Sequence, residues 1–177
     1  MRVLLFVVVL LATGVYLFLR WTAAGRKEAA EASAMLRSKM LNREFQSENP
    51  DLRGVAMDWG VGGSSVSTLV SLSDGSTSLY FSSGGGMLGL GEREGLQGAA
   101  EAFRAAVTAK EAEFSAVTDF PPPPSGHVVF YVLGESATVS SGVLRVRDIE
   151  QVGHSMEPIW RASNELITAA RKEVGWF

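Results

Sequence analysis

Residues 66–82, VSTLVSLSDGSTSLYFS, are the stretch that decides the fold of this chain. Apolar and polar residues alternate over Val66–Leu72, and a second run with the composition of a strand follows over Ser76–Ser82. The Asp74-Gly75 pair between them is a strong hairpin signal, because both central residues of a type I′ turn need positive φ. The stretch therefore predicts a β-hairpin, and with it an antiparallel sheet.

Three further segments outside this hairpin have the pattern of strands. Leu52–Val61 alternates between two sides, with Val55 and Met57 on one side, and predicts a half-buried strand. His127–Leu133 is a nearly continuous apolar run, which is typical of a central strand buried on both faces. Thr138–Val146 predicts a last strand, broken by a turn or bulge near its middle. The predicted sheet therefore has five strands.

Helical spacing of apolar residues marks two segments of the same domain, residues 92–114 and residues 155–172. A third segment, residues 22–49, is rich in Ala, Glu, Lys and Leu, lacks proline before Pro50, and predicts a helical stalk. We expect the stalk to pack one side on the domain. The sequence thus predicts a single α+β domain over residues 50–177, with order βββαββα and its helices covering one face of the sheet.

The N-terminal stretch Val3–Leu19, VLLFVVVLLATGVYLFL, carries no charge and is just long enough to span a hydrocarbon core as a helix. Arg2 precedes it, and Arg20-Trp21 follows it at the level where headgroups would lie. Residues 1–21 are therefore predicted to be a transmembrane anchor and residues 3–19 to lie in the bilayer. Positions that sample the length of this span are Val3, Leu10, Gly14 and Leu19.

Two alternatives to an anchored cytoplasmic domain stay open at this point. Thr22-Ala23-Ala24 could be a cleavage site, and removal of the segment near Ala24 would leave a secreted or extracytoplasmic domain. An uncleaved anchor with its N-terminus inside the cell would also place the domain outside. Lys and Arg are more frequent after the apolar stretch than before it, which favours the cytoplasmic side by a small margin. The expected location is the cell membrane, as a single-pass protein.

Charge and composition narrow the class of partner. Residues 1–49 carry seven Lys and Arg against four Asp and Glu, whereas residues 50–177 carry nine against fifteen. An acidic domain is repelled by phosphate backbones, so nucleic acid is not an expected partner. The chain has no cysteine, which excludes disulfides, thiol catalysis and thiolate metal sites.

A glycine-rich loop is the one motif with a possible ligand. Gly84, Gly86 and Gly89 match the spacing G-x-G-x-x-G after a predicted strand and before a helix, where backbone N–H groups can close on a phosphate. Against this, the loop follows an antiparallel hairpin, and Glu92 and Glu94 would repel an anion. A crossover loop is therefore the main interpretation, and a nucleotide or anion sensor using the Gly84–Gly91 loop is the alternative.

No residue pattern indicates catalysis. The two histidines, His127 and His154, lack a recognisable triad partner or metal-ligand spacing, so neither a cofactor nor a metal is predicted. The preferred hypothesis is a membrane-anchored binding or scaffolding module without enzymatic activity. Its partner could be another protein or a second copy of the chain, with the helical stalk or a sheet edge as the contact of a homodimer.

Overall fold

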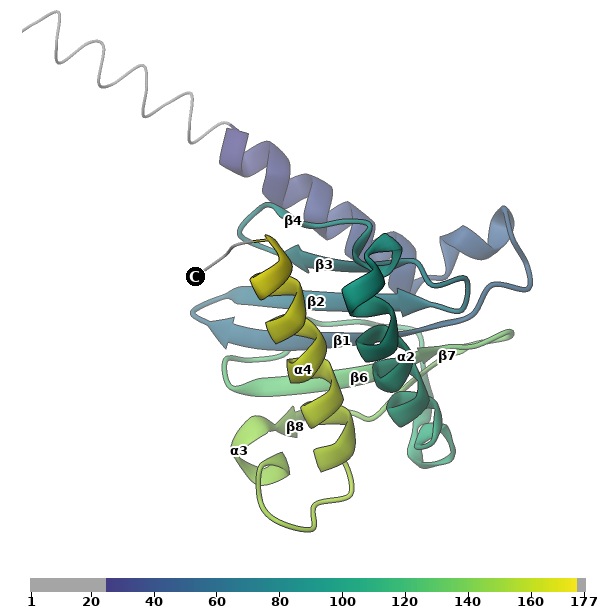
Figure 1. Ribbon diagram of the computed structural model, residues 1–177, viewed down its shortest axis with the longest axis vertical. Helices are drawn as coiled ribbons and strands as arrows, with labels where there is room; N and C mark the ends of the chain where they lie inside the picture. Colours follow the sequence, from purple (N-terminus) through teal and green to yellow (C-terminus); the bar gives the residue numbers. More distant parts are fainter. Residues whose placement is uncertain (1–24, 175–177) are drawn as a thin grey trace, which may run out of the picture.

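The computed structural model describes residues 25–174, and over this range the chain is an α+β fold built on one antiparallel sheet (Figure 1). The sheet has eight strands in the order β4-β3-β2-β1-β6-β7-β5, and β8 pairs with β6 beside this path. The strands are β1 Gly54–Gly62, β2 Ser65–Leu72, β3 Thr77–Phe81, β4 Gly86–Met87, β5 Ser115–Val117, β6 His127–Leu133, β7 Thr138–Ser140 and β8 Leu144–Arg145.

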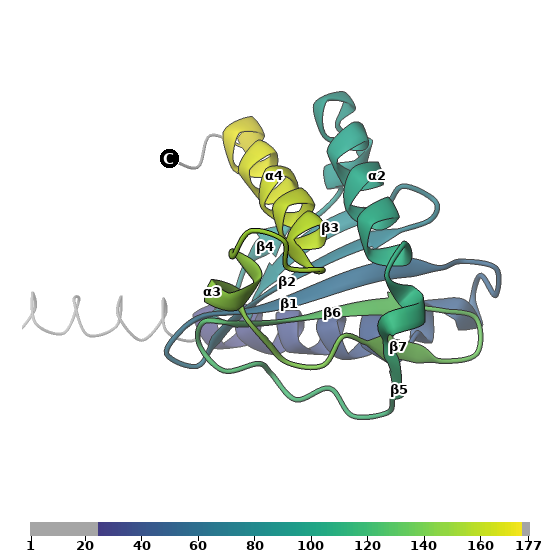
Figure 2. The ribbon, with the colours of Figure 1, turned by 90° about the horizontal axis from the view of Figure 1, so that it is seen from below.

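Helices lie on both faces of this sheet (Figure 2). A helix of residues 25–41, here called the N-terminal helix, covers one face, and α2 and α4 cover the other. The remaining helical segments are short. The bounds are η1 Glu44–Ser47, η2 Leu90–Glu92, α2 Glu94–Thr108, η3 Glu111–Glu113, α3 Val146–Ile149 and α4 Glu157–Val174.

Two apolar clusters fill the space between these layers. The larger cluster lies between the sheet and α2 and α4, where Met57 and Phe130 pack against Phe103 and Leu166. The smaller cluster lies under the N-terminal helix, where the fully buried Leu41 meets side chains from the opposite face of the sheet. Because side chains alternate along a strand, β1 sends Met57 into the first cluster and Ala56 into the second.

Two predictions about this architecture are wrong. The sheet has eight strands instead of five. β4 and β5 are only two and three residues long and cannot show a periodicity, and the predicted strand Thr138–Val146 is divided into β7 and β8 at its expected break. The helices also do not share one face. The N-terminal helix covers the face that the alternation of Leu52–Val61 left open to solvent, so β1 is buried on both sides along most of its length.

The hairpin prediction is confirmed, with a different turn. β2 and β3 pair antiparallel from Ser67↔Phe81 to Ser71↔Thr77. Only Gly75 has positive φ in the turn, at 93°, so it is not a type I′ turn. The Asp74 carboxylate accepts a hydrogen bond from the Ser76 amide at 2.8 Å, and this bond closes the longer loop.

The predicted transmembrane segment Val3–Leu19 lies outside the described residues, as does Ala24 at the predicted cleavage site. Within residues 25–174, no helix combines the length and the apolar character that crossing a membrane requires.

Candidate functional site

A buried carboxylate sits in the central strand, beneath the N-terminal helix. Asp58 has no exposed surface, and it lies opposite Thr68 in the β1–β2 register. The Thr68 hydroxyl donates a hydrogen bond of 2.6 Å to Asp58 Oδ1. A charge in this position needs compensation, since a buried ion without a partner is strongly destabilising.

Arg37 of the N-terminal helix supplies that compensation. Its Nε and Nη2 both donate to Asp58 Oδ2, at 3.0 and 2.6 Å, and the Arg37 side chain is 17% exposed. Nη2 also donates to the Phe120 carbonyl at 2.8 Å, in the proline-rich loop that precedes β6. One guanidinium therefore joins the helix, the central strand and this loop.

Tyr131 lies beside the ion pair on the same face of the sheet. Burial raises the pKa of its hydroxyl well above the usual value of 10.0, and the negative charge of Asp58 raises it further. The Phe120 ring packs edge-on against the Tyr131 ring, with centroids 5.9 Å apart. Phe120 thus packs, from the loop side, on the ring that lies beside the ion pair.

The space next to the ion pair is small. A cavity of about 140 Å³ borders Arg37 and Thr68 and is closed by residues from three other segments. This volume is below the range of about 300–1,000 Å³ that is usual for ligand pockets. Its remaining lining residues are Ser33, Ala34, Ser64, Val66, Tyr80, Ser82 and Pro122.

Further contacts fix the N-terminal helix at its other positions. In its middle, the Ser33 hydroxyl donates to the Gly85 carbonyl at 3.2 Å. At its end, the Leu41 carbonyl accepts a bond of 2.8 Å from the buried Thr138 hydroxyl. Arg43 follows with φ of 59°, and its guanidinium donates to three carbonyls of the β6–β7 turn, at 2.7, 3.0 and 3.3 Å. The helix is therefore held to the sheet from its middle to its end.

The three glycines of the glycine-rich loop have separate structural roles. Gly84 packs on the N-terminal helix, so that a Cβ there would lie 3.0 Å from the Ala29 side chain. Gly86 belongs to β4, where a Cβ would overlap the Leu79 carbonyl. Gly89 has φ of 67° at the start of η2. Close packing accounts for Gly84 and Gly86, and anion binding by this loop stays a prediction.

The histidines occupy local hydrogen bonds. His127 Nδ1 lies 3.0 Å from the Ser125 carbonyl, and His154 Nδ1 accepts from the Met156 amide at 3.2 Å. Among residues 25–174, no group of three or more His, Cys, Asp or Glu side chains is placed to hold a metal ion.

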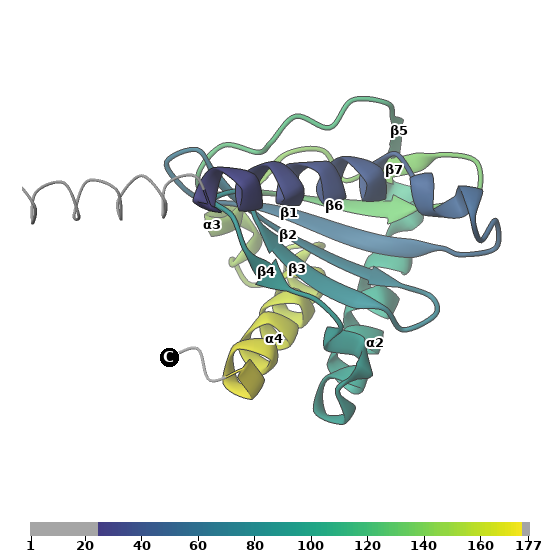
Figure 3. The same ribbon diagram turned by 90° about the horizontal axis from the view of Figure 1, so that it is seen from above.

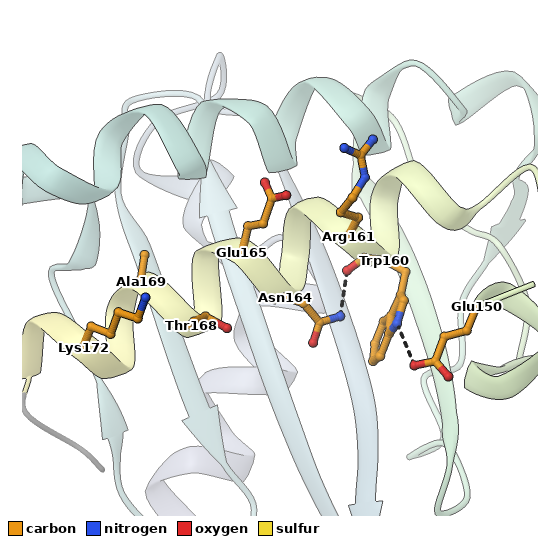
Figure 4. Close-up of a pocket in the computed structure, with 8 residues that line it drawn as sticks. All are labelled: Glu150, Trp160, Arg161, Asn164, Glu165, Thr168, Ala169 and Lys172. Carbon is orange, nitrogen blue, oxygen red and sulfur yellow. Dashed lines mark hydrogen bonds between the residues drawn. The ribbon is translucent and has the colours of Figure 1, made fainter. Parts of the chain in front are cut away.

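A shallow groove of about 600 Å³ runs along the outer side of α4 (Figure 4). Trp160 closes one end, and its indole N–H donates to Glu150 at 3.3 Å, while its ring packs edge-on against Trp59 at 5.2 Å. The lining combines apolar surface with side chains of both charges. The other lining residues are Arg161, Asn164, Glu165, Thr168, Ala169 and Lys172.

The pairing of Arg37 with Asp58 was not predicted from the sequence. The available signal was an acidic residue inside an otherwise apolar strand, VAMDWGV, because such a residue is rarely buried without a partner. Nothing in the spacing identified Arg37 as that partner, since the two residues belong to segments that meet only in the folded chain.

No protein-family model, no curated protein and no solved structure matches this chain. A function for it therefore has to rest on its own residues.

Proposed function

We propose that this chain is a single-pass membrane protein whose α+β domain binds or scaffolds a partner without catalysis. The observation that carries the proposal is the attachment of the N-terminal helix to the sheet by the Arg37–Asp58 ion pair. This helix begins only a few residues after the apolar stretch Val3–Leu19. An anchor formed by that stretch would then be joined, through residues 20–24, to a helix that is docked on the domain.

The chemistry of the described residues supports binding more than catalysis. Asp58 is a fully buried carboxylate, and both of its oxygens are engaged by Arg37 and Thr68. A general base needs a free lone pair within reach of a substrate, which this arrangement does not provide. The α4 groove, in contrast, offers apolar surface and charged edges to a protein segment, with the mostly buried Trp160 at one end.

The proposal includes a side of the membrane and an oligomeric state that can be tested. We place the domain in the cytoplasm because of the basic residues that follow the apolar stretch. A homodimer would need a surface other than the apolar side of the N-terminal helix, since Leu36, Met40 and Leu41 pack on the sheet of the same chain. Sedimentation of the full chain in detergent measures its oligomeric state.

Membrane fractionation of the full-length chain tests the anchor. We expect wild type and Leu10→Ala to stay in the membrane pellet after a carbonate wash. Leu10→Arg should move to the supernatant, because a cation near the middle of a span costs about 3 kcal/mol or more. Mass spectrometry of the product shows whether Met1 is retained. Protease treatment of intact cells then reports the side on which the domain lies.

The outcomes separate the alternatives. A product that begins at or near Gly25 and is recovered outside the cell supports cleavage and a secreted domain. An uncleaved wild-type chain in the carbonate supernatant contradicts the anchor altogether.

A further inference from the structure

Three loops meet at the end of the sheet where the N-terminal helix begins (Figure 3). They are the β1–β2 turn with the end of β1 at residues 61–64, the β3–β4 turn at residues 82–85 and the proline-rich loop at residues 121–126, here together called the rim. Ser64, Ser82 and Pro122 line one cavity with Ser33 of the helix, so the three loops are neighbours. Gly84 packs against the first turns of the same helix.

The rim carries no Asp, Glu, Lys or Arg. Its exposed apolar side chain is Val61, which is 46% exposed near the end of β1, just before the β1–β2 turn. Pro121–Pro124 have no backbone N–H, so this loop exposes fewer hydrogen-bond donors that would need a partner away from water.

The opposite end of the sheet has the reverse character. The β2–β3 turn carries Asp74, and the β6–β7 turn carries Glu135, whose side chain is 80% exposed. Asp51 precedes β1 at the same end, because Gly54 pairs with Leu72 and Leu133 there. Charged side chains therefore gather at the end far from the start of the N-terminal helix. The carboxylates there are accompanied by Arg53, which lies 3.3 Å from Glu135, and by Arg43, which donates to the Glu135 carbonyl. The charges on and around α3, beside the rim, are balanced between Arg145, Arg147, Asp148 and Glu150.

We propose that the rim rests against the phospholipid headgroups of the membrane in which the chain is anchored. The inference rests on the proposed function, since it takes Val3–Leu19 as the anchor. Residues 20–24 can extend over at most about 18 Å, so the first turn of the N-terminal helix stays close to the bilayer surface. Since that helix is fixed to the sheet by Arg37, the end of the domain nearest the lipid is the rim.

Electrostatics and hydration favour this orientation over its reverse. Anionic headgroups repel carboxylates, and the repulsion falls off within a Debye length, so Asp74 is best kept on the distant end, whereas the charge of Glu135 is balanced by Arg53. An uncharged rim can approach the interface without losing the hydration of an ion. Val61 adds a small apolar side chain that can enter the headgroup layer.

The chain contains no cysteine, so a single introduced cysteine gives a single labelled position. Ser64→Cys places a fluorophore on the rim, and Ser76→Cys places the same fluorophore in the β2–β3 turn at the far end. Both serines are exposed turn residues, which makes them a matched pair. The full-length chain is reconstituted into protein-free phospholipid vesicles in which a fraction of the lipids carries a quencher on the headgroup.

We expect the label at position 64 to lose fluorescence to the headgroup quencher and the label at position 76 to keep it. Val61→Asp in the Ser64→Cys chain should reduce that loss in vesicles with anionic lipid, whereas Val61→Thr should leave it unchanged. If the Val61→Asp chain regains the loss of fluorescence in vesicles of neutral lipid, then charge repulsion, and not misfolding, causes the change.

The results also separate this inference from the proposed function. Vesicles that carry the protein but show equal quenching at the two positions, or none, overturn the rim contact and leave the anchor standing. A wild-type chain that does not sediment with vesicles overturns the anchor first. Suppose instead that the label at position 64 is quenched in native membranes and not in vesicles of pure lipid. That result would assign the rim to a protein partner and contradict the lipid contact.

Discussion

Asp58 carries a negative charge with no exposed surface, and its stability depends on the two side chains that reach it. Removing Arg37 would leave the carboxylate buried and unpaired, whereas changing Asp58 to Asn keeps a neutral group of the same shape beside Thr68. The two partners of one ion pair are therefore not equivalent, because the charge that stays behind differs in its access to water: Arg37 is 17% exposed and Asp58 is 0% exposed.

We expect Arg37→Ala to lower the free energy of unfolding by about 3–5 kcal/mol and Asp58→Asn by about 1–3 kcal/mol. In the double variant the loss should be smaller than the sum of the two, since no unpaired charge stays behind. Urea unfolding of the full chain in detergent, followed by near-ultraviolet circular dichroism of the tryptophans, measures all three. Wild-type stability of Arg37→Ala would refute the role given to this residue.

Tyr131 makes the stability of the fold sensitive to alkaline pH. Burial, and then the charge of Asp58, raise the pKa of its hydroxyl above 10.0, so the native state keeps a proton that the unfolded chain releases above pH 10. The unfolded state then binds fewer protons, and the free energy of unfolding falls as pH rises, by about 1.4 kcal/mol per pH unit for one proton. Below pH 10 this contribution is constant.

Tyr131→Phe should therefore unfold with a shallower dependence on pH above pH 10, by up to this one-proton slope. Urea midpoints measured at a series of pH values for both chains test the difference. Tyr80, whose pKa burial also raises, remains in the variant and accounts for a residual slope. Parallel curves for the two chains would show that Tyr131 ionises normally in the native state.

At the scale of the elements, we expect alanine substitutions at two glycines to change the stability of the fold in opposite directions, because the surroundings of the two glycines differ. Gly60 lies in β1 against the proline-rich loop, where a Cβ would overlap the Pro124 carbonyl, and its own carbonyl accepts from the Gly126 amide at 2.8 Å. Gly98 lies inside α2, and a Cβ there would meet nothing within 4 Å. Backbone cannot move aside as a flexible side chain can.

Gly60→Ala should thus destabilise the fold by about 1–3 kcal/mol, and Gly98→Ala should stabilise it by about 0.5–1 kcal/mol. Thermal melting of the two variants beside wild type gives the sign of each change. Equal melting temperatures for Gly60→Ala and wild type would mean that the loop at Pro124 is not held against β1.

The elements also show what the sequence can and cannot predict. Long periodic segments were identified, including the β2–β3 hairpin, β6 and α4, because their patterns extend over several turns or side-chain alternations. The segments that each of these elements contacts in the folded chain were not identified. The alternation in β1 is the same whether its second face meets water or a helix, so the covering of Ala56 and Asp58 by the N-terminal helix could not be read from it.

At the scale of the whole molecule, the position of the N-terminal helix predicts a folded unit that begins before residue 50. Fully buried or nearly buried side chains on the covered face of the sheet include Ala56, Tyr131 and Leu133, and they meet Leu41 of the helix. A chain cut before Pro50 would expose this face together with the unpaired charge of Asp58. Each of these losses is comparable to a sizeable fraction of the stability of a small domain.

A fragment of residues 50–177 should therefore expose apolar surface and unfold or associate, whereas residues 25–177 should fold in the absence of the anchor. Binding of a hydrophobic dye and sedimentation of the two fragments distinguish these states. Adding Asp58→Asn to the shorter fragment should recover only the electrostatic part of the loss, because the apolar face stays open. If residues 50–177 alone gave a compact monomer with a cooperative unfolding transition, the N-terminal helix would be an attachment and not a layer of the fold.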